Sequence, residues 1–113
     1  MTPSRLPVVW REGIYAMRLD DFCEETGLQP EALKVDVDGA EIAVLEGGIR
    51  TLQSERLRSL VIESDDPKVR GECAALLREA GFQCVWRDQH GTSTNEVWAR
   101  ESVPSFKTRM VAQ

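Results

Sequence analysis

The stretch KVDVDGAE, residues 34–41, joins the end of a predicted strand to the start of a predicted helix. Apolar and polar residues alternate from Leu33 onward, and this period of two is typical of a strand over 33–37. A helix is predicted to follow at once, because apolar residues recur three and four positions apart at Ile42, Leu45, Ile49 and Leu52. The stretch therefore predicts a strand that leads directly into a helix.

Two further elements are predicted before this unit. Residues 14–19 alternate well enough to suggest a short strand. A helix is predicted over 21–26, with Asp20 as its N-cap and Gly27 as the glycine that ends it. The order so far is strand, helix, strand, helix.

Three strands and one helix are predicted after the unit. Residues 57–64 form the next strand, and Asp66 followed by proline is an N-cap pattern for a helix. That helix ends at Gly81, and its apolar face comprises Val69, Cys73, Leu76, Leu77 and Ala80. Residues 82–88 and 95–100 favour two antiparallel strands joined by a polar turn.

Strands that alternate with helices favour a parallel sheet covered by helices, because parallel strands need long crossover connections. The fold class predicted is therefore α/β, with a mostly parallel sheet and a C-terminal antiparallel hairpin. A chain of 113 residues has room for a single domain, which we place over residues 1–113.

The composition excludes several classes of protein. The formal net charge is −5 and the basic residues are scattered, so no basic surface for nucleic acid is predicted. No apolar run approaches the roughly 18 residues of a membrane span. The three cysteines show neither disulfide nor zinc spacing, which favours reduced thiols and a cytoplasmic protein.

The acidic residues at two strand ends are the candidate functional site. Asp36 lies inside one predicted strand near its carboxyl end, Asp38 follows that strand and Glu63 ends the next, and ligands of open α/β sheets bind at such ends. Two structural roles compete with this interpretation. Asp38 and Glu41 fit a capping box, and Asp36 could form an ion pair with Lys34.

Metal binding through an EF-hand loop fails on spacing. If Gly39 takes the invariant glycine position, Lys34 stands at the first ligand position and Leu45 at the twelfth. No metal ligands are therefore assigned.

Three other features are interpreted as structural. His90 is predicted to be an exposed turn residue, and Trp86 and Trp98 are predicted to form a packed cross-strand pair. Gly47-Gly48 indicates a close approach or a kink.

Four segments together resemble the FkbM-type methyltransferases. The match spans roughly residues 18–87, and its segments are LDDFCEETGL (19–28), LKVDVDGAEIAVLEGGIRTL (33–52), LVIES (60–64) and LLREAGF (76–82). The family's IDVEGAE element corresponds to residues 35–41, with Asp38 where glutamate is commoner. The resemblance implies a Rossmann-like fold that uses S-adenosylmethionine to methylate hydroxyl groups of sugars or natural products.

The resemblance also assigns roles to residues. It implies that Asp36, Asp38 and Glu63 line the catalytic crevice, and that Asp36 and Glu41 contribute to cofactor binding. Residues 1–17 contain only Gly13 and no glycine-rich turn between a strand and a helix, which such folds use to hold the cofactor. We therefore expect the C-terminal half of a methyltransferase domain, inactive by itself.

Three functions stay open at this point. The chain is the acceptor-side half of an oxygen methyltransferase that acts on a small-molecule hydroxyl, or a non-catalytic remnant or binding module of the same fold. In the second case a partner chain or a second copy would pair with the sheet edge left open by the missing strands. A third possibility keeps the acidic cluster as a divalent-metal site and drops the methyl donor.

Overall fold

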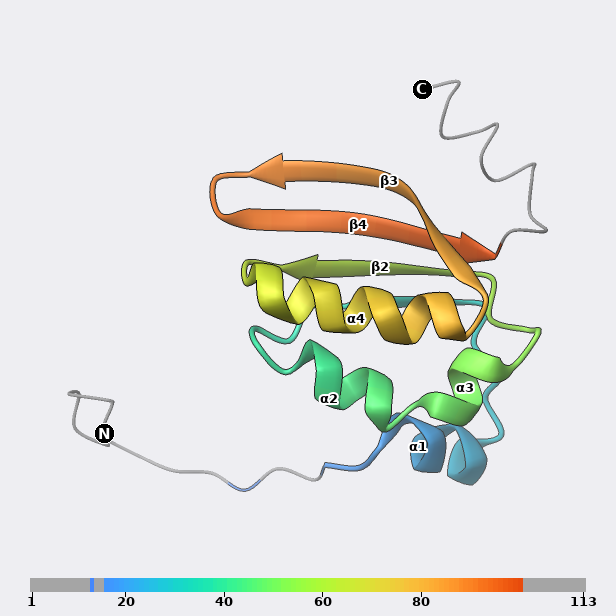
Figure 1. The fold of residues 1–113 in the computed structure, drawn as a ribbon. Helices are drawn as coiled ribbons and strands as arrows, with labels where there is room; N and C mark the ends of the chain where they lie inside the picture. The colour runs from blue at the N-terminus through green and yellow to red at the C-terminus, as the bar shows by residue number, and fades with distance from the viewer. Residues whose placement is uncertain (1–12, 14–15, 101–113) are drawn as a thin grey trace.

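The computed structural model describes residue 13 and residues 16–100, which Figure 1 shows in colour. Four helices and four strands follow one another along this part of the chain. In order they are α1 (Leu19–Thr26), β1 (Ala32–Val35), α2 (Glu41–Glu46), α3 (Ile49–Gln53), β2 (Ser59–Ser64), α4 (Pro67–Glu79), β3 (Phe82–His90) and β4 (Ser93–Arg100).

The four strands form one mixed sheet in the order β1-β2-β4-β3 (Figure 1). β1 and β2 are parallel, whereas β4 lies between β2 and β3 and is antiparallel to both. The α/β class is confirmed, but the prediction of a mostly parallel sheet is wrong. The reason is that β4 pairs with β2 as well as with β3, so two of the three strand pairings are antiparallel.

The strand predicted over 14–19 does not join this sheet within the described residues. Residues 14 and 15 lie outside them, residues 16–18 belong to no strand, and Leu19 already begins α1. β1 is consequently one of the two edge strands of the described sheet, and β3 is the other.

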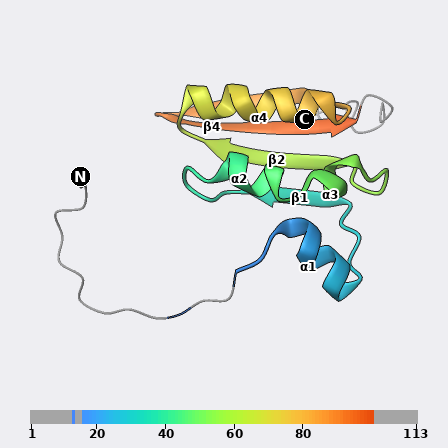
Figure 2. The same cartoon turned by 60° about the horizontal axis from the view of Figure 1, so that its bottom comes forward.

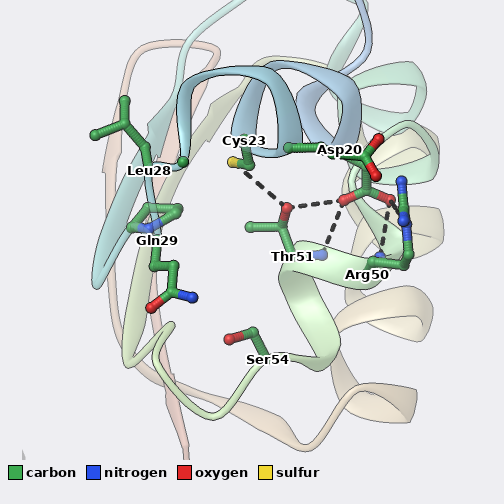
Figure 3. Close-up of a pocket in the computed structure, with 10 residues that line it drawn as sticks. Asp20, Cys23, Leu28, Gln29, Arg50, Thr51 and Ser54 are labelled. Carbon is green, nitrogen blue, oxygen red and sulfur yellow. Dashed lines mark hydrogen bonds and ion pairs between the residues drawn. The ribbon is translucent and has the colours of Figure 1, made fainter.

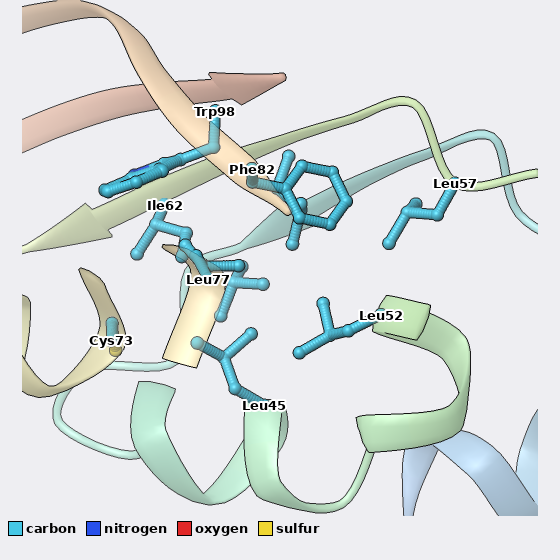
Figure 4. Close-up of a cluster of buried hydrophobic side chains, with 10 residues drawn as sticks. Leu45, Leu52, Leu57, Ile62, Cys73, Leu77, Phe82 and Trp98 are labelled. Atoms are coloured by element: carbon cyan, nitrogen blue, oxygen red, sulfur yellow. The ribbon is translucent and has the colours of Figure 1, made fainter. Parts of the chain in front are cut away.

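Helices α2, α3 and α4 lie on the same face of the sheet, as the two views in Figures 1 and 2 show. The core between them is apolar, and Figure 4 shows Ile62 and Trp98 from the sheet facing Leu45, Leu52 and Leu77 from the helices. All five of these side chains are at most 2% exposed. Burying each one contributes about 1.5–3 kcal/mol relative to leaving it in water.

The boundaries of α4 confirm the predicted capping residues. Asp66 is the N-cap, and its side chain accepts a hydrogen bond of 2.9 Å from the backbone N–H of Lys68, with proline at the first helical position. Gly81 follows the helix with φ of 98°, a left-handed conformation that glycine adopts without strain. Local sequence alone therefore determines where α4 begins and ends.

The helix predicted from Ile42 to Leu52 is two short helices, α2 and α3, separated by Gly47 and Gly48. A Cβ atom on Gly48 would lie 2.7 Å from Cδ2 of Leu19, which is too close for any real contact. The close approach predicted from the two glycines is thus confirmed. It arises because α1 packs against this junction, where the backbone N–H of Asp20 donates to the carbonyl of Gly47 at 2.9 Å.

The hairpin differs from its prediction in the length of its strands and in which residues lie opposite each other. β3 extends to His90 and β4 begins at Ser93, so both strands are longer than predicted. The register of their pairing shifts between Cys84 and Trp86. Cys84 therefore pairs with Trp98, and Trp86 pairs with Val97. The predicted tryptophan pair is wrong, because this bulge leaves Trp86 42% exposed while Trp98 is fully buried.

Candidate functional site

Two acidic segments meet where β1 and β2 end. Because β1 and β2 are parallel, the residues that follow β1 lie beside the end of β2, at the left of Figure 1. Asp36 comes directly after β1, and Asp38 and Gly39 turn the chain into α2 with φ of 43° and 98°. Aspartate tolerates this left-handed region better than most residues, which suits Asp38 to the turn.

A small hollow of about 50 Å³ lies at these strand ends, and we call it the acidic hollow. Its lining contains all four candidate residues from the sequence together with three others: Asp36, Asp38, Glu41, Glu63, Ser64, Asp65 and Ser93. Five of the seven side chains are carboxylates. The structure therefore brings together residues from the β1–α2 segment, from the end of β2 and from the start of β4.

The capping box predicted for Asp38 and Glu41 is wrong. The N-cap of α2 is Ala40, and no side chain caps this helix. Glu41 instead accepts a hydrogen bond of 3.1 Å from the backbone N–H of Gly39 through Oε2. The left-handed turn at Asp38 and Gly39 moves Asp38 out of the N-cap position, so its side chain is exposed and lines the acidic hollow.

The alternative of an ion pair between Asp36 and Lys34 is not formed among the described residues. Both side chains are exposed, and the four ion pairs within residue 13 and residues 16–100 join other groups. The prediction that the strand runs to residue 37 is wrong, because β1 ends at Val35; Asp36 therefore lies beyond the strand and faces no buried environment that would require a partner. Its carboxylate is free to contact a ligand.

Glu63 is held in place by a residue that sequence patterns did not indicate. Its Oε2 accepts a hydrogen bond of 3.1 Å from the hydroxyl of Ser93, the first residue of β4. Only the insertion of β4 beside β2 creates this contact, and the hairpin pattern alone contains no signal for that insertion. Sequence patterns also did not indicate Ser64, which lines the same hollow.

A second hollow of about 360 Å³ lies between α1 and α3, near the start of β1 and away from the acidic hollow. Figure 3 shows Cys23, Leu28, Gln29 and Ser54 around it, with the carboxylate of Asp20 at one side. Asp20 accepts hydrogen bonds from the backbone N–H groups of Arg50 and Thr51, both 2.9 Å, and from the Thr51 hydroxyl at 2.8 Å.

These contacts explain why the pKa of Asp20 is lowered. Burial acts to raise the pKa of Asp20, but the hydrogen bonds from Arg50 and Thr51 and the charge of Arg50 outweigh it, so the pKa is lowered. The prediction that Asp20 caps its own helix is wrong, because Arg18 is the N-cap of α1 and Asp20 caps α3. Its role in this hollow is therefore structural.

His90 has the exposure expected of it, although it ends β3 and does not lie in a turn. Its Nε2 lies against the carboxylate of Asp88 on the same strand. Neither residue lines the acidic hollow. Among the described residues, no group of three or more histidine, cysteine or acidic side chains has a geometry that could hold a metal ion.

Comparison with known proteins identifies the family. The profile of the Methyltransferase FkbM domain matches residues 13–84, which include the whole of α1, β1, α2, α3, β2 and α4. Searches of curated proteins and of solved structures found no match to the chain. Within the described residues, no helix is both long enough and apolar enough to cross a membrane. Since the match covers more than half of the sequence, the chain belongs to the FkbM methyltransferase domain family.

Proposed function

We propose that the chain takes part in transfer of a methyl group from S-adenosylmethionine to a hydroxyl oxygen of a small molecule. Family membership supports methyl transfer as the chemistry. One structural observation supports the site: carboxylates from separate segments converge in the acidic hollow, at the carboxyl ends of two parallel strands. Ligands of open α/β sheets bind at this position.

In this proposal Asp36, Asp38 and Glu63 act on the acceptor. S-Adenosylmethionine supplies an electrophilic methyl group, and the protein must hold the attacking oxygen in line with it. Asp36 and Asp38 are exposed, so either carboxylate can reach the acceptor hydroxyl and accept its proton. Glu63 is fixed by its hydrogen bond to Ser93 and can orient the same group.

The fit of the methyl donor to the described residues is incomplete. Asp36 and Glu41 can receive polar groups of the donor, as the family resemblance implies, but a hollow of about 50 Å³ cannot enclose a nucleoside. β1 has β2 as its neighbour on one side and no described strand on the other. We therefore propose that the described residues are the acceptor-side half, and that further strands beside β1 complete the donor site.

The test is a calorimetric titration of the 113-residue chain with S-adenosylmethionine, together with an assay for release of S-adenosylhomocysteine. We expect weak or no binding and no turnover by this chain alone. Both should appear when a glycine-rich cofactor half is supplied in front of residue 13. Tight binding by the chain alone would contradict the proposed half-domain.

We call the chain with this cofactor half supplied the completed protein. In the completed protein, we expect D36N and D38N to lower turnover by about 10²–10⁴-fold, the usual contribution of a general base. D88N is the matched control, because Asp88 lies on β3, outside the acidic hollow. Unchanged turnover in both D36N and D38N would show that the acidic hollow is not the catalytic site.

A non-catalytic binding module is the second candidate, and the open edge of β1 favours it. Ala32 and Lys34 are exposed on this strand, and an unpaired edge can add a strand from another chain. Under this alternative the purified chain is a stable dimer or captures a partner through β1, and binds no methyl donor. Light scattering of the chain separates the two functions.

A further inference from the structure

Glu41 has a carboxylate that the described structure satisfies only in part. The residue is 1% exposed, and its Oε2 accepts the hydrogen bond from the backbone N–H of Gly39. Its Oε1 is buried and has no hydrogen-bond partner among the described residues. Buried polar atoms almost always have a partner, since leaving one without a hydrogen bond is costly. An ionised carboxylate only accepts hydrogen bonds, so its missing partner is a donor.

The lining of the acidic hollow cannot supply that donor. The hydroxyl of Ser93 is directed to Glu63, and the hydroxyl of Ser64 donates to the carbonyl of Asp66 at 3.5 Å. All other side chains that line the hollow are carboxylates, which accept hydrogen bonds when ionised. A ligand that enters the hollow is therefore the natural source of the donor for Glu41.

Charge in the hollow favours a cation over a neutral donor. Five carboxylates line it, no basic side chain does, and none of these carboxylates takes part in the ion pairs among the described residues. The negative field of Glu41 also reaches Cys73, where burial first and then this carboxylate raise the thiol pKa to about 11. Such a concentration of one sign attracts the opposite charge.

The volume of the hollow and its lining limit which cations it can bind. A volume of about 50 Å³ exceeds the roughly 30 Å³ that one water occupies in the liquid, and suits an ammonium group with one or two carbons. An ammonium group has three donors and no acceptor, which matches a lining of acceptors. An amino acid fits less well, because the lining would repel its carboxylate. The carboxylates also lack the grouping that a metal ion needs.

We infer that the acidic hollow binds the protonated amine of a small-molecule ligand, with Glu41 Oε1 as the buried acceptor. This inference rests on the proposed function and deepens it, because it assigns Glu41 to the methyl acceptor in place of the methyl donor and makes that acceptor an amine-bearing alcohol such as an amino sugar. The amine anchors in the hollow, while the hydroxyl to be methylated stays near Asp36 and Asp38 at its exposed rim. Glu41 is in this respect a binding residue and takes no part in proton transfer.

The experiment is a titration of the 113-residue chain, followed through the amide resonance of Gly39, whose N–H contacts Glu41. The probes are ethanolamine, its neutral analogue ethylene glycol, its acidic analogue glycolate, and L-methionine. We expect a saturable shift with ethanolamine alone. Binding of L-methionine as tightly as ethanolamine would assign the hollow to the amino group of the methyl donor and overturn the acceptor assignment. A shift with magnesium chloride that displaces ethanolamine would overturn it in favour of a metal.

The variant E41Q keeps an oxygen for the Gly39 N–H and removes the charge. We expect E41Q to weaken ethanolamine binding at least tenfold, and E46Q to leave it unchanged. Glu46 is the matched control, because it lies on the same helix, is exposed and does not line the hollow. Equal affinity of the wild type and E41Q would overturn the inference.

The melting temperature of E41Q is a second readout, because a binding role and a purely structural role of Glu41 predict changes of opposite sign. Without a ligand, E41Q should raise the melting temperature, since it removes a buried and uncompensated charge. A lowered melting temperature would mean that Glu41 supports the fold and would overturn the binding role. Ethanolamine binding without methyl transfer in the completed protein would refute only the proposed function. Methyl transfer to amine-free alcohols without ethanolamine binding would refute only this inference.

Discussion

At the scale of single residues, Asp20 shows where local patterns mislead. Its position before a short helical segment predicts an N-cap, yet its carboxylate serves the backbone of α3, some 30 positions further along the chain. α3 has only five residues and no side-chain cap of its own at Gly48. A contact between residues so far apart depends on packing, which spacing along the sequence does not reveal.

Replacing Asp20 tests this contact through its dependence on pH. Because the pKa of Asp20 is lowered in the folded protein, its carboxylate stabilises the fold above the unfolded pKa of about 3.9, and this contribution is lost as pH falls through the folded value. We expect D20N to lower the free energy of unfolding at pH 7 by about 1–3 kcal/mol. In urea denaturation the difference from wild type should shrink at about pH 3.

Asp21 provides the control, since it is an exposed neighbour in the first turn of the same helix. D21N should change the free energy of unfolding by less than about 0.5 kcal/mol, as is usual for surface substitutions. A D20N variant as stable as wild type at neutral pH would mean that the hydrogen bonds to Arg50 and Thr51 contribute little.

At the scale of elements, the glycines determine how α1 meets the α2–α3 junction. The helical period of the sequence continues through Gly47 and Gly48, so periodicity alone predicts one helix. The break has a steric cause, because Leu19 occupies the space where a side chain at position 48 would lie. The paired glycines signalled this approach, but the partner helix could not be named from the sequence.

Alanine substitutions separate steric packing from helix propensity. In α4, Gly71 has open space around its Cβ position, so G71A should raise the free energy of unfolding by about 0.5–1 kcal/mol. G48A should lower it by about 1–3 kcal/mol, the usual cost of overpacking, because the new methyl group would lie 2.7 Å from Leu19. Chemical denaturation of both variants checks the opposite signs, and a stabilising G48A would contradict the close packing of α1.

At the scale of the whole molecule, the sequence predicted most elements but not how the strands pair. The position of α4, the strand before it and the acidic strand ends follow from caps and periods that act over a few residues. The mixed sheet and the contact of Ser93 with Glu63 depend on β4 lying beside β2, which is a choice between distant segments. The acidic hollow was predicted through its residues, while the partly satisfied Glu41 emerged only in three dimensions.

The same strand order makes the edge of β1 the most informative place to test assembly. Lys34 is the exposed charge on this short edge strand, and lysines on edge strands hinder pairing with other chains. K34V would convert the strand into the apolar run Ala-Leu-Val-Val, so we expect concentration-dependent self-association by light scattering. K34E keeps a charge at this position and should behave as wild type does. If the wild-type chain is already a dimer that K34V does not alter, the edge is a true interface and the binding-module function gains over the half-domain enzyme.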